Sequence, residues 1–216
     1  MRGFGIGALV AGAALLVAGC GDGGTAYPAG LADDAYDLEA MALQAADLPP
    51  GFEQQSPGEF ENEAWASVFQ TDDVEAKLRQ LEAQGRQRNF VTLFGPQGLG
   101  PVLAVTAIST LYTDAAAAER SLREFACGLP IEANVQLEPL LVPKLGDGSN
   151  GFLERQFSEG APTFVDATIC FRTGRVVHAI QATSVAGVED VAFLVRLAER
   201  QLVRVDAAFA AADGGG

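Results

Sequence analysis

Histidine and cysteine are scarce in this sequence of 216 residues, which has one histidine and three cysteines. It contains no Gly-x-Ser-x-Gly elbow, no His-Glu-x-x-His motif, no P-loop and no dinucleotide-binding fingerprint. Every triad of the Ser-His-Asp type would have to use His178, and two distant cysteines with one histidine do not make a zinc site. We therefore predict no catalytic residues, no metal ligands and no cofactor, and expect a protein that is not an enzyme.

Basic residues are missing from a long N-terminal stretch. Between Arg2 and Lys77 there is no lysine or arginine, whereas the same stretch has thirteen carboxylates, and the formal net charge of the chain is −14. Binding to a phosphate backbone requires clustered basic residues, so nucleic acid is disfavoured as a partner. The carboxylates lack the alternate spacing of a calcium loop, and we expect them to form a solvated acidic face.

The first nineteen residues have the features of a leader. A positive charge at Arg2 is followed by an apolar run, too short to span a bilayer well, and by small residues before Cys20. The sequence Leu16-Val17-Ala18-Gly19-Cys20 resembles a bacterial lipobox, after which the leader is cleaved and the cysteine is lipidated. The resemblance implies a signal peptide over residues 1–19 and lipidation of Cys20. The alternative is an ordinary secretory leader, which leaves Cys20 as an unexplained thiol.

Residues 20–32 are rich in glycine and small side chains and predict a flexible tether with a span of roughly 20 Å. The two acyl chains on Cys20 would give a lasting membrane anchor. Residues 33–212 are long enough for one hydrophobic core and predict a single domain. We expect this domain outside the cytoplasm, on the cell surface or the periplasmic face of a bacterial membrane.

The most regular pattern in the chain lies in residues 163–185, which predict two strands joined by a tight turn at Thr173 and Gly174. Alternate residues of the first strand are apolar, so one face of the hairpin is expected to be buried. A two-residue loop at these positions would place Phe171 opposite Val176. From Val188 onward the apolar period becomes helical, which predicts a long C-terminal helix covering the hairpin.

The other segments alternate between helical and extended patterns. Helices are expected at residues 34–45, 72–85 and 114–126, and strands at 90–94, 102–112, 135–142 and 151–157. Residues 53–60 are predicted to be a loop, and the segment with Trp65 and Phe69 suits a short helix or a strand. Together these elements predict an α+β domain with a single antiparallel sheet of about five or six strands, helices packed on it, and a long C-terminal helix.

Two cysteines remain after Cys20. Outside the cytoplasm two thiols in one small domain usually pair, so we predict a disulfide between Cys127 and Cys170, with two buried free thiols as the alternative. Cys170 is expected on the opposite face of the sheet from the alternating apolar residues of its strand. If all helices covered the apolar face, the chain at Cys127 would have to pass round a sheet edge to reach Cys170. His178 is expected to be a core or edge histidine bonded to the backbone.

Three short motifs of the C-terminal half carry a resemblance: Gly146-Asp147-Gly148-Ser149, Arg172-Thr173-Gly174 at the hairpin tip, and Leu197-Ala198 in the last helix. With them this half resembles uncharacterised bacterial surface lipoproteins. It is also similar in outline to the extracellular sensor domains of bacterial serine/threonine kinases, which are disulfide-braced sheets flanked by helices. The resemblance implies a ligand-binding or sensing module, although one cysteine pair is fewer than such sensors often have.

We expect the ligand site in a cleft between the sheet and the N-terminal helices, near Trp65, Phe90 and Tyr112, which would equally suit the core. The partners would be the membrane, through the lipid anchor, and a small molecule or an envelope protein. The alternative function is an envelope scaffold without a small-molecule site. An enzyme, such as a hydrolase, would need paired carboxylates, for example Asp147 and Asp166, in one cleft.

Lipidation can be tested directly. Because the thiol of Cys20 would carry both acyl chains, the Cys20→Ser chain is expected to leave the membrane fraction and to gain no lipid mass. Fractionation and mass spectrometry measure both effects, and Cys170→Ser serves as the control that keeps the lipid. A Cys20→Ser chain that stays membrane-associated would contradict the assignment.

Overall fold

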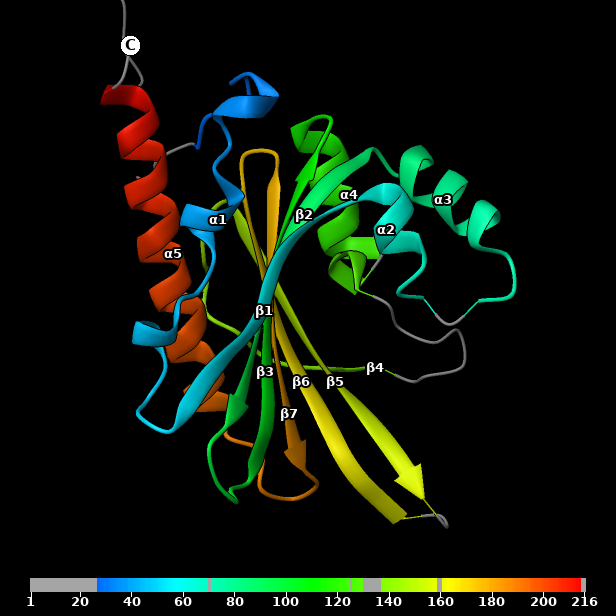
Figure 1. Ribbon diagram of the computed structural model, residues 1–216, viewed down its shortest axis with the longest axis vertical. Coiled ribbons are helices and arrows are strands. Elements are labelled where there is room, and N and C mark those ends of the chain that lie inside the picture. The colour runs from blue at the N-terminus through cyan, green and yellow to red at the C-terminus, as the bar shows by residue number, and fades with distance from the viewer. Residues whose placement is uncertain (1–26, 70, 125, 130–136, 159–160, 215–216) are drawn as a thin grey trace, which may run out of the picture.

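The computed structural model describes residues 27–69, 71–124, 126–129, 137–158 and 161–214 (Figure 1). Residues 1–19 and Cys20, with the predicted leader and lipidation site, lie outside these ranges. One seven-stranded antiparallel sheet, in the order β1-β2-β3-β7-β6-β5-β4, forms the centre of the domain. The predicted α+β class is confirmed, with more strands than expected. Within the described ranges, no helix combines the length and the apolar character needed to cross a membrane.

The strands of the sheet are β1 (Phe52–Glu61), β2 (Arg86–Pro96), β3 (Val102–Tyr112), β4 (Leu137–Pro139), β5 (Gly148–Ser158), β6 (Ala161–Thr173) and β7 (Val176–Val185). The helices are α1 (Leu38–Met41), α2 (Asn62–Ala66), α3 (Val74–Ala83), α4 (Ala115–Glu124) and α5 (Val191–Gly214). Short turns of 3-10 helix occur at η1 (Asp33–Ala35), η2 (Ala45–Asp47) and η3 (Ala126–Gly128). The predicted long C-terminal helix is therefore confirmed as α5.

The β6–β7 hairpin is confirmed, but its register differs from the prediction. Phe171 lies opposite His178 rather than Val176, because Thr173 pairs with Val176 and the loop is Gly174-Arg175. Gly174 adopts a φ of +59°, which suits a tight hairpin loop. The shift is two residues, so every side chain keeps the face that its alternation predicts.

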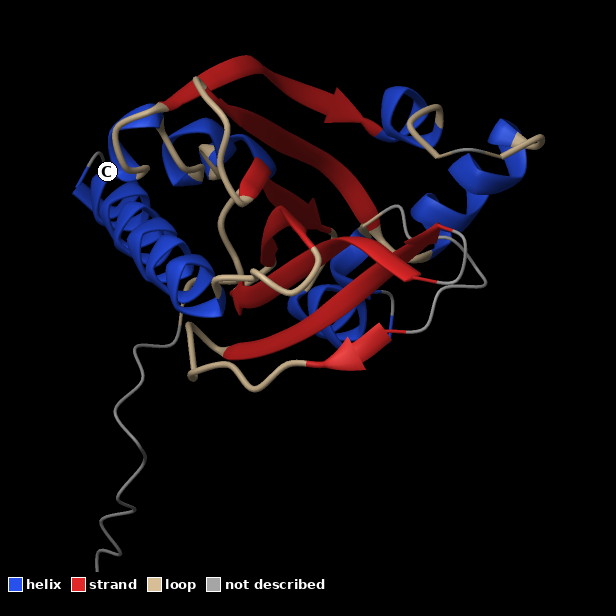
Figure 2. Ribbon diagram, turned by 90° about the horizontal axis from the view of Figure 1, so that it is seen from below, coloured by secondary structure: helices blue, strands red, loops and turns tan. Residues whose placement is uncertain are grey.

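Helices cover both faces of the sheet (Figures 1 and 2). On one face, α1 and α5 pack on a core cluster that includes Ile169, Phe171 and Ile180. On the other face, α2, α3 and α4 cover a second cluster that includes Cys170. Because α4 and the following η3 lie on the face of Cys170, Cys127 reaches its partner without passing round a sheet edge.

The predicted disulfide joins Cys127 of η3 to Cys170 of β6, with 6.3 Å between the Cα atoms. Ala126, Cys127 and Gly128 all have positive φ, at 47°, 62° and 76°. This backbone conformation costs roughly 1–2 kcal/mol for each residue other than glycine. The disulfide holds this strained turn against the second core cluster.

Two N-terminal predictions are wrong. Residues 34–45 form η1, α1 and the start of η2 rather than one helix, because Tyr36, Leu38, Met41 and Leu43 are all buried and one helical stripe could not face all of them inward. The predicted loop at 53–60 is the edge strand β1. An edge strand tolerates the proline at position 57, which lies in the register shift between Gln55 and Gly58.

Residues 27–32, expected in the tether, lie against the domain. The Tyr27 hydroxyl donates to Asp206 Oδ1 at 2.6 Å, and the Tyr27 ring packs 5.6 Å from that of Phe209. Arg175 at the hairpin tip binds Asp33 at 2.6 Å. Tyr27 therefore contacts the domain predicted for residues 33–212, whereas residues 20–26 of the predicted tether lie outside the described ranges.

The disulfide closes 43 residues of chain and is expected to contribute about 4 kcal/mol, since it restricts the unfolded ensemble. The double variant Cys127→Ala/Cys170→Ala should therefore unfold at a lower urea concentration. Reductant should lower the midpoint of the wild-type domain and leave that of the double variant unchanged. Equal midpoints for oxidised wild type and variant would contradict this role.

Candidate functional site

An apolar groove lies at the end of the sheet where β1 and α5 begin. Its volume is about 400 Å³. Its lining residues come from the segment before β1, the β2–β3 loop and the start of α5: Pro49, Gly51, Phe52, Pro96, Gly98, Leu99, Gly100, Pro101, Val102, Asp190 and Phe193. The groove therefore brings together three segments that are far apart in the sequence.

Backbone contacts hold the β2–β3 loop in place as one wall of the groove. The amide of Gln97 donates to the carbonyl of Gly51 at 2.7 Å, and its side chain donates to Glu53 at the same distance. On the other side, the amide of Val185 donates to the carbonyl of Pro101 at 3.1 Å. The loop is thus fixed to both β1 and β7.

The floor of the groove is aromatic. Phe52 and Phe193 stack with their ring centroids 6.1 Å apart, which joins the beginning of β1 to that of α5. Asp190 caps α5 by accepting from the amide of Phe193 at 2.8 Å. This carboxylate is the one charged side chain among the lining residues, so the surface suits a mainly apolar ligand.

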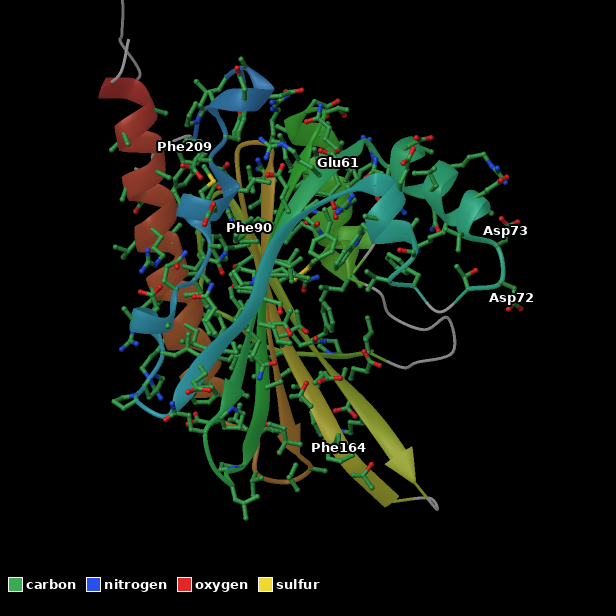
Figure 3. All side chains as sticks on the ribbon, viewed as in Figure 1. Glu61, Asp72, Asp73, Phe90, Phe164 and Phe209 are labelled. Atoms are coloured by element: carbon green, nitrogen blue, oxygen red, sulfur yellow. A yellow bond between two sulfur atoms is a disulfide. The ribbon has the colours of Figure 1, made fainter. Side chains whose placement is uncertain are left out.

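Exposed apolar side chains gather at the same end of the molecule. They are Leu99, Leu103, Phe164, Val185 and Val188, all in loops or strand ends. Leu99 has a relative exposure of 110%. Figure 3 places Phe164 toward this end and Phe209 of α5 toward the other. Clustered exposure of this kind is typical of binding surfaces.

The three aromatic residues predicted near a ligand do not share one site. Trp65 and Tyr112 lie in the core cluster under α2 and α4, whereas Phe90 lies in the cluster on the opposite face of the sheet. All three are buried, and none lines the groove. Tyr112 and Ser121 share a hydrogen bond at 2.5 Å. A ligand-binding role for these aromatics stays a prediction.

The two carboxylates considered for an enzyme are not brought together. Asp147 accepts from the amide of Gly174 at 2.7 Å and from Arg172 at 3.2 Å, which joins the Gly-Asp-x-Ser motif to the hairpin tip. Asp166 accepts from Thr183 in the middle of the sheet. Asp166 lies six residues before Arg172 on β6, so about 20 Å of strand separates Asp166 from the residue that binds Asp147.

His178 is buried in a polar network within the core. One ring nitrogen lies 2.9 Å from Ser109 Oγ and the other 2.9 Å from Thr173 Oγ1. The expectation of a core histidine is confirmed, but its partners are side chains rather than backbone. Burial lowers the pKa of His178 to about 3, so the imidazole is neutral at physiological pH. Among the residues that the structure describes, no His/Cys/Asp/Glu group could hold a metal ion.

Sequence reasoning did not find the groove. Its signal was the density of proline and glycine in residues 49–51 and 95–101, which predicted turns and loops and nothing more. The exposed Leu99 within the second segment was the further hint, because a large apolar residue in a turn has no local reason to be there.

No family model matches the chain, and no curated protein matches its sequence. Among solved structures, the chain is similar to the extracellular domain of PknH, a serine/threonine kinase of Mycobacterium tuberculosis, with a TM-score of 0.54 and 11% identity. The match covers 82% of this chain and 97% of that one. At this identity the likeness concerns the fold, and the predicted similarity in outline to such extracellular domains is confirmed at that level.

Because His178 is the only histidine, its titration can be isolated. The unfolded chain binds a proton near pH 6.5 and the folded chain only near pH 3, so stability falls as the pH drops below 6.5. Between pH 7.5 and 5.5 the loss should be about 1.4 kcal/mol. Urea unfolding should show this loss in the wild type and not in His178→Gln.

The variant Ser109→Ala removes one hydrogen bond of the network and keeps the imidazole, so it should retain the wild-type pH dependence. Parallel pH profiles for the wild type and His178→Gln would show that the buried histidine does not control stability in this range.

Proposed function

We propose that the chain is an extracytoplasmic sensing module, anchored by lipid at Cys20, that binds an apolar small molecule in the groove. The observation that carries this proposal is a groove of about 400 Å³ with one charged lining residue. Ligand sites usually measure 300–1,000 Å³ and are mainly apolar. The proposal assigns no catalytic activity and no cofactor to the chain.

The position of the N-terminal segment supports an orientation in which the groove faces away from the membrane. Tyr27 contacts α5 at Asp206, whereas the groove adjoins Asp190, sixteen residues earlier. That distance is about 24 Å along the helix. A chain that continues from Tyr27 toward a lipidated Cys20 would therefore leave the groove facing away from the membrane, where ligands arrive from outside.

The fold likeness supports the proposed location outside the cytoplasm. The extracellular domain of PknH has the same overall arrangement at a TM-score of 0.54. Its fold is thus known in a domain displayed outside a cell. We propose the same location for this chain, with a lipid anchor as the means of attachment.

An envelope scaffold that binds proteins is the second candidate. The exposed apolar residues in and near the groove, above all Leu99 and Val188, favour it, because a protein partner would bury them together. In that case the groove would be the edge of a protein interface and would hold no small molecule.

Glycine substitutions can separate these candidates. At Gly98, which lines the groove, no atom lies within 4 Å of an added Cβ, and the same is true of Gly30, which is not among the lining residues. Gly98→Phe should narrow the groove and weaken binding of a neutral naphthylamine dye at least about tenfold, which is 1.4 kcal/mol. Gly30→Phe should bind the dye as the wild type does.

Envelope lipids and metabolites should then displace the dye from the wild type and raise its Tm. No dye binding, or equal binding by both glycine variants, would contradict a ligand groove. A photo-cross-linker at Leu99 that captures one protein reproducibly, without dye binding, would favour the scaffold.

A further inference from the structure

Arg86, at the start of β2, is a buried cation that forms no salt bridge with any carboxylate of the described residues. Its relative exposure is 3%, and its one hydrogen-bond acceptor is Asn62 Oδ1. Its Nε and Nη2 atoms have no hydrogen-bond partner in the described part of the chain. Arg175 is also buried, at 8% exposure, but it pairs with Asp33 at 2.6 Å. Arg86 therefore differs from Arg175 in having no salt-bridge partner within the described part of the chain.

The two unpartnered nitrogens form one edge of the guanidinium. The N–H bonds along such an edge are nearly parallel, and they match two oxygens of a carboxylate or phosphate. The opposite side of the group is occupied by Asn62, whose amide also donates to the carbonyl of Arg86 at 2.7 Å. Asn62 thus holds the guanidinium in one orientation and leaves its free edge for another partner.

Two further buried groups next to Arg86 lack partners. Asn89 is fully buried, and neither its amide nitrogen nor its oxygen has a partner in the described residues. The indole nitrogen of Trp65 is likewise buried and unpartnered, and its ring centroid is 5.4 Å from Cζ of Arg86. Arg86 lies opposite Tyr112 and Asn89 opposite Thr110, so both occupy the same face of β2. Most of these unpartnered atoms are donors.

A buried, uncompensated charge is costly, because it loses its hydration without gaining a counter-ion. Burial lowers the pKa of Arg86 to about 10, which still leaves it charged at neutral pH. The contact with the Trp65 ring offsets part of the cost. Glu61, the last residue of β1 and labelled in Figure 3, attracts Arg86 only from beyond salt-bridge distance. An external anion would supply the missing charge.

A small cavity of about 190 Å³ lies between α3 and η3, and Arg86, Asn89 and Trp65 are not among its lining residues. Phe69, which contacts the Trp65 ring edge-on at 6.2 Å, forms one wall. Gly128 forms another, and a Cβ there would lie 2.8 Å from the hydroxyl of Tyr112. Lys77 and Glu124 also line the cavity, and Nζ of Lys77 lies 3.6 Å from the centroid of the Phe69 ring. The ring of Phe69 therefore lies between this cavity and Trp65.

We propose that Arg86, Asn89 and Trp65 form a binding site for an oxyanion with two adjacent oxygens, the carboxylate or phosphate group of a small molecule. The guanidinium edge would hold both oxygens, while the indole and amide N–H groups would donate to them. Arg86 lies ten residues before Pro96 of the groove, which corresponds to about 33 Å along β2. The proposed anion site is therefore independent of the function proposed for the groove.

Trp65 is the only tryptophan, so its fluorescence reports on this site alone. The full chain, purified in detergent, would be titrated with phosphate, sulfate and acetate at ionic strength held constant with sodium chloride. A saturable change in Trp65 emission is expected, with a Tm increase of roughly 5 °C at about 100-fold above Kd. Acetate against phosphate separates a carboxylate from a phosphate site.

Arg86→Met should abolish the saturable response, because the charged fork is lost. Arg88→Met is the matched control, since Arg88 lies two residues away and already pairs with Glu59 at 2.7 Å. It should keep the response. Asn89→Leu should weaken binding at least about tenfold, and it decides the question if Arg86→Met does not fold. No saturable response in the wild type, or an unchanged one in Arg86→Met or Asn89→Leu, would overturn the proposal.

Discussion

Strands β6 and β7 are buried on both faces of the sheet, and the remaining architecture follows from the need to cover both. Ile169, Phe171 and Ile180 face one core cluster, while Cys170 and Val177 face the other, all at 1% exposure or less. A strand pair of this kind requires a layer on each side. The long helix α5 supplies one layer, and α4 belongs to the other, together with η3, which the disulfide joins to β6.

The two ends of the sheet, which the helical layers leave uncovered, have different surfaces. At the hairpin tip the chain from Tyr27 to Asp33 is fastened to Asp206 and Arg175, so that end is closed by polar contacts. At the opposite end the loops carry proline, glycine and exposed apolar side chains, and the groove opens there. The proposed orientation toward a membrane is a consequence of this asymmetry.

Two buried polar clusters, around His178 and around Arg86, differ in whether their hydrogen-bonding groups have partners. We use this difference to distinguish structural groups from groups that bind a ligand. His178 is neutral and is held by Ser109 and Thr173, so its ring nitrogens need no external partner. Arg86 keeps its charge, and four polar atoms of Arg86 and Asn89 have no hydrogen-bond partner among the residues that the structure describes. The first cluster is explained by folding alone, whereas the second is explained by an anion.

The sequence by itself determined the elements whose pattern is local: the alternation of β6 and β7 and the helical period of α5. It also predicted the pairing of Cys127 with Cys170, because these are the two cysteines that remain after Cys20. The hairpin register, the edge strand β1, the broken N-terminal helix, the groove and the isolation of Arg86 were decided by tertiary structure. Each depends on segments distant in sequence, as where Gln97 binds Gly51 or Asn62 binds Arg86. Alternation and spacing fix which face a side chain occupies, but only the assembled layers decide what lies opposite it.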